Sequence, residues 1–328
     1  MIIWGMVGNS HDASLAVFVD NKLAWASLSK DFSDVPNDPD FSWTQIEAAR
    51  QSYGPPDKVI WYERPFLKTL RQFAAGQGWL AKENNIKQYL KKWDINCPIE
   101  YVDHHESHAA YGYYTSGFND ATIICIDSIG EFETFTIWTG KDRELKKVYR
   151  QNYPHSIGLF YSAMTQRCGL KPNAEEHILS EYAIKGDRYA YLDAIEKDFT
   201  VQKSLKGFWQ VRFKENLHRG CNWWRPELNT EQDMADIAAT TQHIFEQVLM
   251  CASSWIQMNI KTSNIILVGG CALNKTAVTK LESVWDDIWV PKNPGDPGSC
   301  IGAVLAKYHK HIDNSNEMWY NKDNGKTK

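Results

Sequence analysis

Three histidines and several carboxylates fall within residues 101–131, whose sequence is YVDHHESHAAYGYYTSGFNDATIICIDSIGE. The segment that starts at the histidines is rich in small and aromatic residues, which is typical of a packed helix. His104 and His108 stand four residues apart, so in a helix they share one face, with Cβ atoms about 5 to 6 Å apart. Two imidazoles placed in this way can bind one metal ion.

Asp127 follows the apolar run TIICI, which predicts a buried strand that ends at this aspartate. Open α/β sheets bind ligands at the carboxyl ends of their strands, so Asp127 is a candidate third ligand, and Gly130 permits a close backbone turn beside it. The run from His105 to His108 does not have the His-Glu-x-x-His spacing of zinc peptidases, so their hydrolytic chemistry does not follow. Histidines at helical spacing also occur in ordinary cores and surfaces, and this alternative stays open.

The composition limits the class of protein. The chain has 328 residues, enough for two domains with cores, and its 36 basic and 40 acidic residues give a net charge of -4, so no global positive field attracts nucleic acid or anionic membrane. Seven cysteines without a Cys-x-x-Cys pair fit reduced thiols. No apolar run approaches the roughly 18 residues of a membrane span, and the first residues do not form a secretion signal. We expect a soluble protein of the cytoplasm, or of the host cytoplasm if it is viral.

Short apolar segments at residues 1–7, 13–19 and 23–28 predict successive antiparallel strands. The turn between the first two carries His11 and Asp12 and could present them to a ligand. An ordinary hairpin with an Asx-type turn is the alternative.

Helices alternate with strands from residue 42 onward, and part of this pattern recurs in the second half, where a strand over 264–268 ends in Gly269 and Gly270. We therefore expect an α/β fold of two ribonuclease-H-like lobes, as in the actin-like ATPase superfamily, with a nucleotide in the cleft between the lobes. The expected division is a lobe over 1–150 with the histidine motif, a lobe over 151–311 with the Gly-Gly turn, and a polar, flexible tail over 312–328.

Six blocks in this order resemble the NodU/CmcH type of O-carbamoyltransferase, whose main domain is similar to the tRNA threonylcarbamoyl-transferase ATPase. Each block alone is weak, and the ordered set is specific. The blocks are GNSHDAS, DHHESHAAYGYYTSGF, IDSIGE, HSIGLFYS, GGCALN and NPGDPGSCIGA.

The resemblance implies a set of ligands. His104, His108, Asp127 and Asp296 would bind a divalent metal ion, iron first and manganese or zinc as alternatives. ATP would be a cofactor and carbamoyl phosphate the donor, joined as carbamoyladenylate. His105 would touch a phosphate or carbamoyl oxygen. The residues expected at the nucleotide are Gly130, Glu131, Gly158, Gly269, Gly270 and Asn274.

The Gly-Gly turn has a physical reason in this scheme, because glycines between a strand and a helix let backbone N–H groups approach a phosphate. A tight turn without a ligand is the alternative.

Two departures from the family stand out. Ile178 and Glu181 replace a lysine and a glycine in a run near the nucleotide, and the further domain that makes carbamoyladenylate in full family members has no counterpart in this sequence.

The expected activity is carbamoyl transfer to an acceptor hydroxyl, with His11 as general base, oriented by Asp12. A sugar-kinase-like ATPase would need no histidine pair, and a tRNA threonylcarbamoyl transferase lacks the His-Asp opening. Carbamoylation of a small-molecule or sugar hydroxyl and a non-catalytic nucleotide-binding scaffold stay open as alternatives.

Residues 203–225 suggest the acceptor. Six Lys or Arg stand there against one acid, Glu215, interleaved with Phe and Trp, and cations with flat rings suit a polynucleotide. Similar single-module viral enzymes act on 5-hydroxymethylcytosine in DNA, which leads us to expect hydroxymethylated DNA as acceptor, held by Arg212, Lys214 and Arg219. A basic surface ribbon over a tryptophan core is the alternative.

Overall fold

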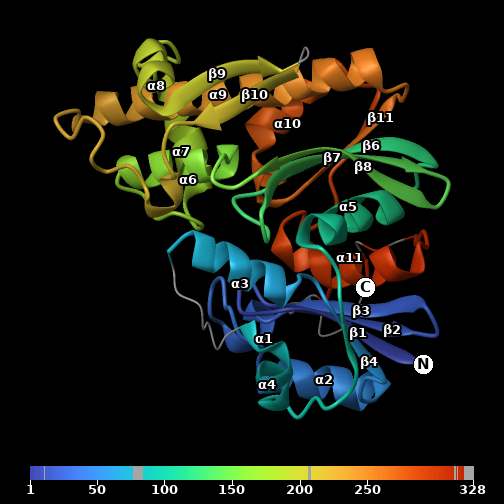
Figure 1. Cartoon of the computed structure of the whole chain (residues 1–328). Coiled ribbons are helices and arrows are strands. Elements are labelled where there is room, and N and C mark those ends of the chain that lie inside the picture. The colour runs from blue at the N-terminus through green and yellow to red at the C-terminus, as the bar shows by residue number, and fades with distance from the viewer. Residues whose placement is uncertain (11, 77–83, 206–207, 314, 316, 321–328) are drawn as a thin grey trace.

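The structure is a computed structural model, and it describes residues 1–10, 12–76, 84–205, 208–313, 315 and 317–320. Two five-stranded sheets lie apart, with helices between them and on their outer faces (Figure 1). None of the helices among these residues combines the length and the apolar character that crossing a membrane requires.

The first sheet has the strand order β3-β2-β1-β4-β5. β1 pairs antiparallel with β2 and parallel with β4, so the three N-terminal strands form the antiparallel meander that the sequence predicts. The strands of this sheet are β1 (Ile2–Val7), β2 (Ser14–Val19), β3 (Lys22–Leu28), β4 (Lys58–Trp61) and β5 (Ile99–Tyr101).

The second sheet repeats this arrangement in the order β12-β11-β6-β7-β8. Its central strand β6 pairs antiparallel with β7 and parallel with β11, as β1 does with β2 and β4. The predicted α/β fold of two similar lobes is confirmed. The strands are β6 (Asp120–Ile126), β7 (Glu133–Lys141), β8 (Glu144–Asn152), β11 (Asn264–Val268) and β12 (Asp287–Trp289).

The change from the first sheet to the second falls between β5 and β6, so β6, β7 and β8 share a sheet with strands from the second half of the chain. The predicted division into domains at residue 150 stays a prediction. The first lobe is defined here as the first sheet with the helices packed on it, and the second lobe as the second sheet with its helices.

Helices of the first lobe include α3, whose N-terminus adjoins β4, and helices of the second lobe include the long α9, which begins at a capping box of Thr230 and Asp233. The α-helices are α1 (Lys30–Ser33), α2 (Trp43–Tyr53), α3 (Pro65–Ala74), α4 (Ile86–Lys91), α5 (His104–Thr115), α6 (Ile157–Arg167), α7 (Glu176–Tyr182), α8 (Leu192–Phe199), α9 (Glu231–Asn259), α10 (Lys275–Leu281) and α11 (Ser299–Tyr308). The short 3-10 helices are η2 (Ala183–Lys185), η3 (Leu217–Arg219), η4 (Gly270–Leu273) and η5 (Asp296–Gly298).

α5 and α11 lie between the two sheets and pack against each other (Figure 1). They approach closely because Gly302 of α11 faces the backbone of Ser107, and a Cβ at position 302 would overlap the carbonyl oxygen of that residue. Gly112 of α5 likewise rests on Ile266 and Val268 of β11. Small residues at these crossings therefore hold the histidine-bearing helix against both lobes.

Two further segments complete the description of the fold. Residues of the basic stretch form a hairpin of β9 (Thr200–Leu205) and β10 (Phe208–Phe213). Residues 317–320 of the expected tail pack on the first lobe, and the flexibility of the tail over 312–328 stays a prediction. Trp319 is buried, its Nε1 donates to the hydroxyl of Tyr111 at 3.2 Å, and its neighbours bond to Ala26 of β3. Burial of the large apolar surface of Trp319 favours this packing, although most of its neighbours in the sequence are polar.

Gly302→Ala tests the packing of α5 on α11. We expect a loss of about 1 to 3 kcal/mol in the free energy of unfolding, because the added methyl group must push two packed backbones apart. Urea unfolding measures it, with Lys307→Ala, an exposed position on the same helix, as the control. A Gly302→Ala protein as stable as the wild type would contradict this account of the crossing.

Candidate metal centre and active site

The two histidines at helical spacing lie on the first two turns of α5, and both are buried. α5 is covered on nearly all sides because it lies between the sheets. His108 Nε2 is 3.0 Å from His104 Nε2. The helix therefore brings both ring nitrogens to one point.

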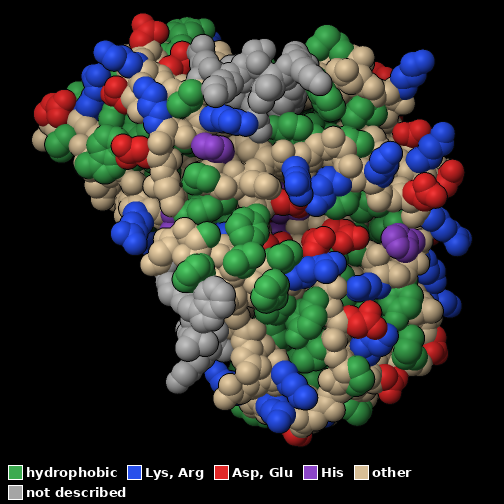
Figure 2. Space-filling model, in the orientation of Figure 1, with side chains coloured by type: hydrophobic (Ala, Val, Ile, Leu, Met, Phe, Trp, Pro, Cys, Tyr) green, Lys and Arg blue, Asp and Glu red, His purple; other side chains and the backbone are tan. Residues whose placement is uncertain are grey.

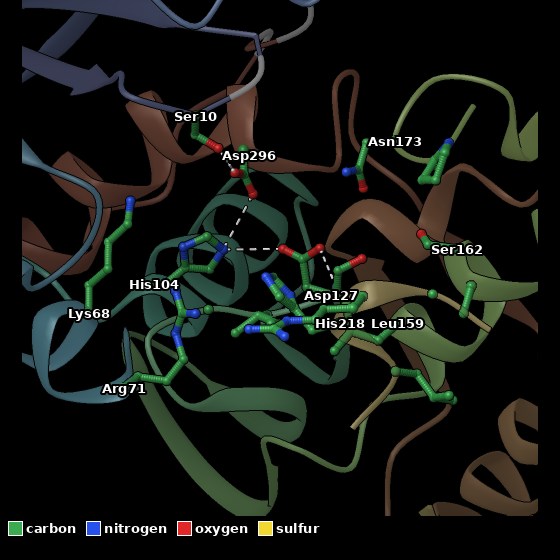
Figure 3. Close-up of a pocket in the computed structure, with 18 of the residues that line it drawn as sticks. Ser10, Lys68, Arg71, His104, Asp127, Leu159, Ser162, Asn173, His218 and Asp296 are labelled. Atoms are coloured by element: carbon green, nitrogen blue, oxygen red, sulfur yellow. Dashed lines mark hydrogen bonds and ion pairs between the residues drawn. The ribbon is translucent and has the colours of Figure 1, made fainter. Parts of the chain in front are cut away.

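Two aspartates from distant parts of the chain reach the same point. Asp127 directly follows β6, and Asp296 begins η5, just ahead of α11. His104 Nε2 lies 3.2 Å from Asp127 Oδ2 and 3.3 Å from Asp296 Oδ1. The corresponding distances from His108 Nε2 are 3.3 and 3.5 Å. Figure 3 shows both carboxylates directed at the same ring nitrogen of His104, Asp296 from above and Asp127 from the right in this view.

The geometry of these four residues fits a metal ion. One ligand atom from each lies within 4.8 Å of all the others. An ion with ligands at about 2.0 to 2.2 Å keeps neighbouring ligand atoms roughly 3 to 3.5 Å apart, which matches the distances between these nitrogens and oxygens. Two imidazoles and two carboxylates suit divalent iron, manganese or zinc.

The protonation of the cluster depends on the mutual contacts of its members. Burial lowers the pKa of His104, but Asp296 and Asp127 outweigh burial and hold this pKa well above its ordinary value. Burial and Asp296 raise the pKa of Asp127, but hydrogen bonds to His104 and His108 outweigh them and lower it. In the protein without metal, imidazolium charge therefore offsets the carboxylates, and a binding metal ion must displace protons.

Two serines that the sequence-based prediction missed support the cluster. Ser10 Oγ donates to Asp296 Oδ2 at 2.8 Å, and Ser299 Oγ lies 3.3 Å from His108 Nδ1. Contacts of this kind orient metal ligands toward the ion. Their only signal in the sequence is that each serine stands in a motif block that also carries a candidate residue.

His105 points away from the cluster. Its Nδ1 lies 2.9 Å from Thr136 Oγ1 of β7, and the side chain is fully buried. Burial, and after it the neighbouring His104 and His108, lower the pKa of His105 well below its ordinary value, so the ring is neutral. Its contact with a phosphate or carbamoyl oxygen stays a prediction.

Glu131 joins the second lobe to two helices that border the site. Its carboxylate accepts the backbone N–H of Arg64, at the start of α3, at 2.7 Å, and that of His104, the first residue of α5, at 3.1 Å. Its carbonyl oxygen accepts from Arg71 Nε at 3.1 Å. A helix leaves its first N–H groups without internal partners, so this buried carboxylate satisfies two helix ends at once. Its nucleotide contact stays a prediction.

The glycines expected at the nucleotide lie where strand ends and helix starts come together. Gly130 lines a cavity between the lobes. A Cβ at Gly158 would lie 2.7 Å from the backbone oxygen of Asp127, and one at Gly270 would lie 3.1 Å from its Oδ1. Gly269 has a φ of 86°, which favours glycine. Gly158 and Gly270 thus bring backbone close to Asp127, and Gly269 brings backbone close to the neighbouring Ile126.

Asn274 bonds within the second lobe. Its Oδ1 accepts the N–H of Ala277 at 3.0 Å and so caps α10, and its Nδ2 donates to Gln242 Oε1 at 2.8 Å. Gln242 lines a second cavity of about 300 Å³, together with Glu246 and Lys280. The contact of Asn274 with a nucleotide stays a prediction.

The predicted base, His11, lies outside the described residues. Asp12 has a φ of 60° on the same turn between β1 and β2, and its Oδ1 lies 3.7 Å from Lys30 Nζ. Ser10, also on this turn, reaches Asp296, so the turn adjoins the metal cluster.

The interlobe cavity lies beside the cluster and has a volume of about 340 Å³. Lys68 and Arg71 of α3 lie on one side of His104, and Ser162 and Asn173 of the second lobe lie on the other side, beyond Asp127 (Figure 3). Lys68 Nζ lies 2.7 Å from Glu63 Oε1. From the second lobe, Ser128, Ile129, Gly130, Leu159, Ala163, Gln166, Pro172, Leu217, His218, Arg219 and Gly220 also line it.

Comparison with known families places this site in context. The sequence model of the family described as the carbamoyltransferase N-terminus matches residues 61–305, a range that holds all four residues of the cluster.

Two longer proteins are similar in sequence. The protein sll1178 of Synechocystis sp. is 28% identical over 95% of this chain and 58% of its own length. Nodulation protein NolNO of Sinorhizobium fredii is 26% identical over 63% of this chain and 31% of its own length. The chain thus spans about half, or less, of the length of the curated relatives it matches.

Two solved structures share the fold at low identity. Full-length HypF in the phosphate- and nucleotide-bound form has a TM-score of 0.53 at 13% identity, covering 97% of this chain and 56% of that one. HypF of T. kodakarensis has a TM-score of 0.50 at 11% identity, covering 94% of this chain and 48% of that one. Both support the two-lobed fold.

His108→Ala tests the metal centre. We expect the affinity for Co²⁺, followed by its visible absorption, to fall by at least about 100-fold while the protein stays folded, because one of four ligands is lost. The wild-type affinity should rise with pH across neutrality, because protons held by His104 compete with the ion. His177→Ala, an exposed histidine on α7, is the matched control, and unchanged affinity in His108→Ala would refute the assignment.

Glu131 offers a separate test, since it touches the backbone but not the ligand nitrogens. Glu131→Ala should lower the free energy of unfolding by about 1 to 3 kcal/mol and weaken Co²⁺ binding by about 10-fold, because two helix-terminal N–H groups lose their acceptor. Burial raises the pKa of Glu131, so the charge itself is not favoured, and Glu131→Gln, which keeps an oxygen there, should change both quantities little. Equal effects of the two substitutions would contradict this role.

Proposed function

The chain belongs to the carbamoyltransferase N-terminal family, and from this premise we propose that it transfers a carbamoyl group to an acceptor hydroxyl in the interlobe cavity. One observation carries the proposal: the cluster of His104, His108, Asp127 and Asp296 borders that cavity. A metal-binding cluster beside a cavity large enough for a small substrate suits a reaction in which charge develops on oxygen.

The proposed donor is carbamoyl phosphate, activated with ATP as carbamoyladenylate. The fold shared with HypF, whose structure is described as phosphate- and nucleotide-bound, supports a nucleotide site between the lobes. The glycines that bring backbone close to Asp127 suit the approach of a phosphate. Carbamoyladenylate forms either on this chain or on a separate catalytic unit, and the two arms of the assay below distinguish these alternatives.

In the proposed transfer step, the acceptor oxygen attacks the carbamoyl carbon, the bond from that carbon to the phosphate oxygen breaks, and the hydroxyl proton passes to a base. His11 is proposed as the base and Asp12 as its orienting partner, on the turn whose Ser10 reaches the cluster. A metal ion bound by the four residues would supply polarisation of the carbonyl or charge for the leaving phosphate. The side chain of His105 is buried and neutral, and its Nδ1 stays in contact with Thr136 of β7.

The proposed acceptor is the hydroxymethyl group of 5-hydroxymethylcytosine in DNA. The basic and aromatic stretch that suggests it leads into the cavity, because its Arg219 lines the wall. Arg212 lies in β10 and Lys214 follows that strand, so both stand on the hairpin that precedes this wall. Cations along such a path would contact the phosphates on either side of a nucleotide that enters the cavity.

The test is transfer itself. DNA containing 5-hydroxymethylcytosine is incubated with the protein, divalent iron or manganese, ATP and carbamoyl phosphate, and in a second arm with prepared carbamoyladenylate, and its nucleosides are analysed by mass spectrometry. We expect the base to gain one carbamoyl group, with the rate reduced at least about 100-fold in His108→Ala and unchanged in His177→Ala.

Each arm has a distinct negative result. If a sugar or another small hydroxyl is carbamoylated and the DNA is not, the acceptor is wrong. If carbamoyladenylate transfers to no hydroxyl, the proposed reaction is wrong.

A further inference from the structure

Two arginines and a histidine from different lobes converge on the interlobe cavity. Arg71 comes from α3 of the first lobe, and His218 and Arg219 come from η3 of the second lobe. All three line the cavity wall (Figure 3 shows Arg71 and His218). His218 and Arg219 are exposed, whereas Arg71 is buried. Burial, then Arg71, then Arg219 lower the pKa of His218, so both guanidinium groups act on its ring and disfavour its protonated form.

The arrangement is built into the fold. Arg71 is only 7% exposed, and its Nε donates to the carbonyl oxygen of Glu131. This bond fixes the guanidinium at the cavity wall, where burial lowers the pKa of Arg71 although Tyr153, Glu63 and Glu131 act to raise it. Arg71 and Arg219 place two positive charges on one cavity, and an anion bound between them offsets their repulsion.

Glu63 and Glu131 act electrostatically on Arg71, and both carboxylates also have other partners. Glu63 forms an ion pair with Lys68, and the carboxylate of Glu131 accepts the N–H groups that start α3 and α5. Asp127 and Asp296 belong to the metal cluster. The cavity is therefore divided into an acidic side that suits a metal ion and a basic side that suits an anion.

Phosphate is the anion class that fits the basic side best. A guanidinium presents N–H groups in a planar fork that matches the oxygens of a phosphate. Figure 2 shows histidine and acidic side chains at the bottom of a narrow opening between the lobes, with Lys and Arg side chains beside it, so a ligand can enter from solvent.

We propose that Arg71, His218 and Arg219 form a subsite for a phosphate group of the acceptor, so that the acceptor is a nucleotide or a nucleotide unit of a polynucleotide and not a neutral sugar or nucleoside. This rests on the proposed function, in which the phosphate of the donor lies at the metal cluster. The basic side then holds the acceptor while its hydroxyl faces the acidic side.

The test is equilibrium binding without donor, measured by calorimetry on the metal-loaded protein. The probes are 5-hydroxymethyl-2′-deoxycytidine 5′-monophosphate and the same nucleoside without phosphate. We expect the nucleotide to bind at least about 10-fold more tightly, the effect of one added charge-assisted contact. Arg219→Glu should abolish this preference and His218→Gln should reduce it, while Lys146→Glu, an equal charge change at an exposed position of β8, should leave it intact.

Other outcomes overturn the proposal. Equal binding of nucleotide and nucleoside by the wild type, or an unchanged preference in a folded Arg219→Glu protein, would exclude the subsite. Loss of the preference in the presence of saturating ATP would assign the subsite to the phosphates of the donor. Since no transfer is needed, failure of the carbamoyl assay with the preference intact would count against the proposed function alone, and equal transfer to both probes would count against the subsite alone.

Discussion

The meeting of two buried imidazoles with two carboxylates is the interaction on which the rest of the structure depends. Asp127 and Asp296 alone would repel each other, and two cations or a metal ion must stand between them. Histidines at the start of α5 suit either state, because the carboxylates favour their protonated forms when no ion is present, and as neutral imidazoles they could bind an ion. The cluster ties α5 to the end of β6 and to η5, so it joins the central helix to both halves of the chain.

The loop after β6 couples the geometry of the cluster to the position of one lobe relative to the other. Within five residues it carries the ligand Asp127, the cavity residue Gly130 and the carboxylate of Glu131 that closes the N-termini of α3 and α5. A shift of the second lobe against the first would therefore move a metal ligand and break two buried hydrogen bonds together. The width of the cavity and the geometry of the cluster are two consequences of one set of contacts.

The features that could be predicted from the sequence are those encoded in a local pattern of residues. The spacing of His104 and His108 was enough to place both on one face of α5, and the alternation of apolar segments was enough for two similar lobes. Asp296, separated from the histidines by almost two hundred residues, could only be inferred by resemblance, and the only signal for Ser10 and Ser299 is that each stands in a motif block with a candidate residue. The order of the chain around Trp319 depends on a partner, Tyr111, that is distant in sequence.

Different elements of the fold form the acidic and the basic side of the cavity. The acidic side is formed by the end of β6 and by η5 before α11, which meet because the first sheet packs on α11, the second sheet packs on α5, and the two helices pack on each other. The basic side is formed by α3 and η3, whose approach across the lobes brings the positive charges of Arg71 and Arg219 to one cavity, so that they repel each other. Packing energy from the shared core maintains this repulsion, and a ligand with a phosphate at one end and a reacting oxygen at the other would relieve it. The same separation of charge orients such a ligand before any bond changes, which is what transfer between two bound molecules requires.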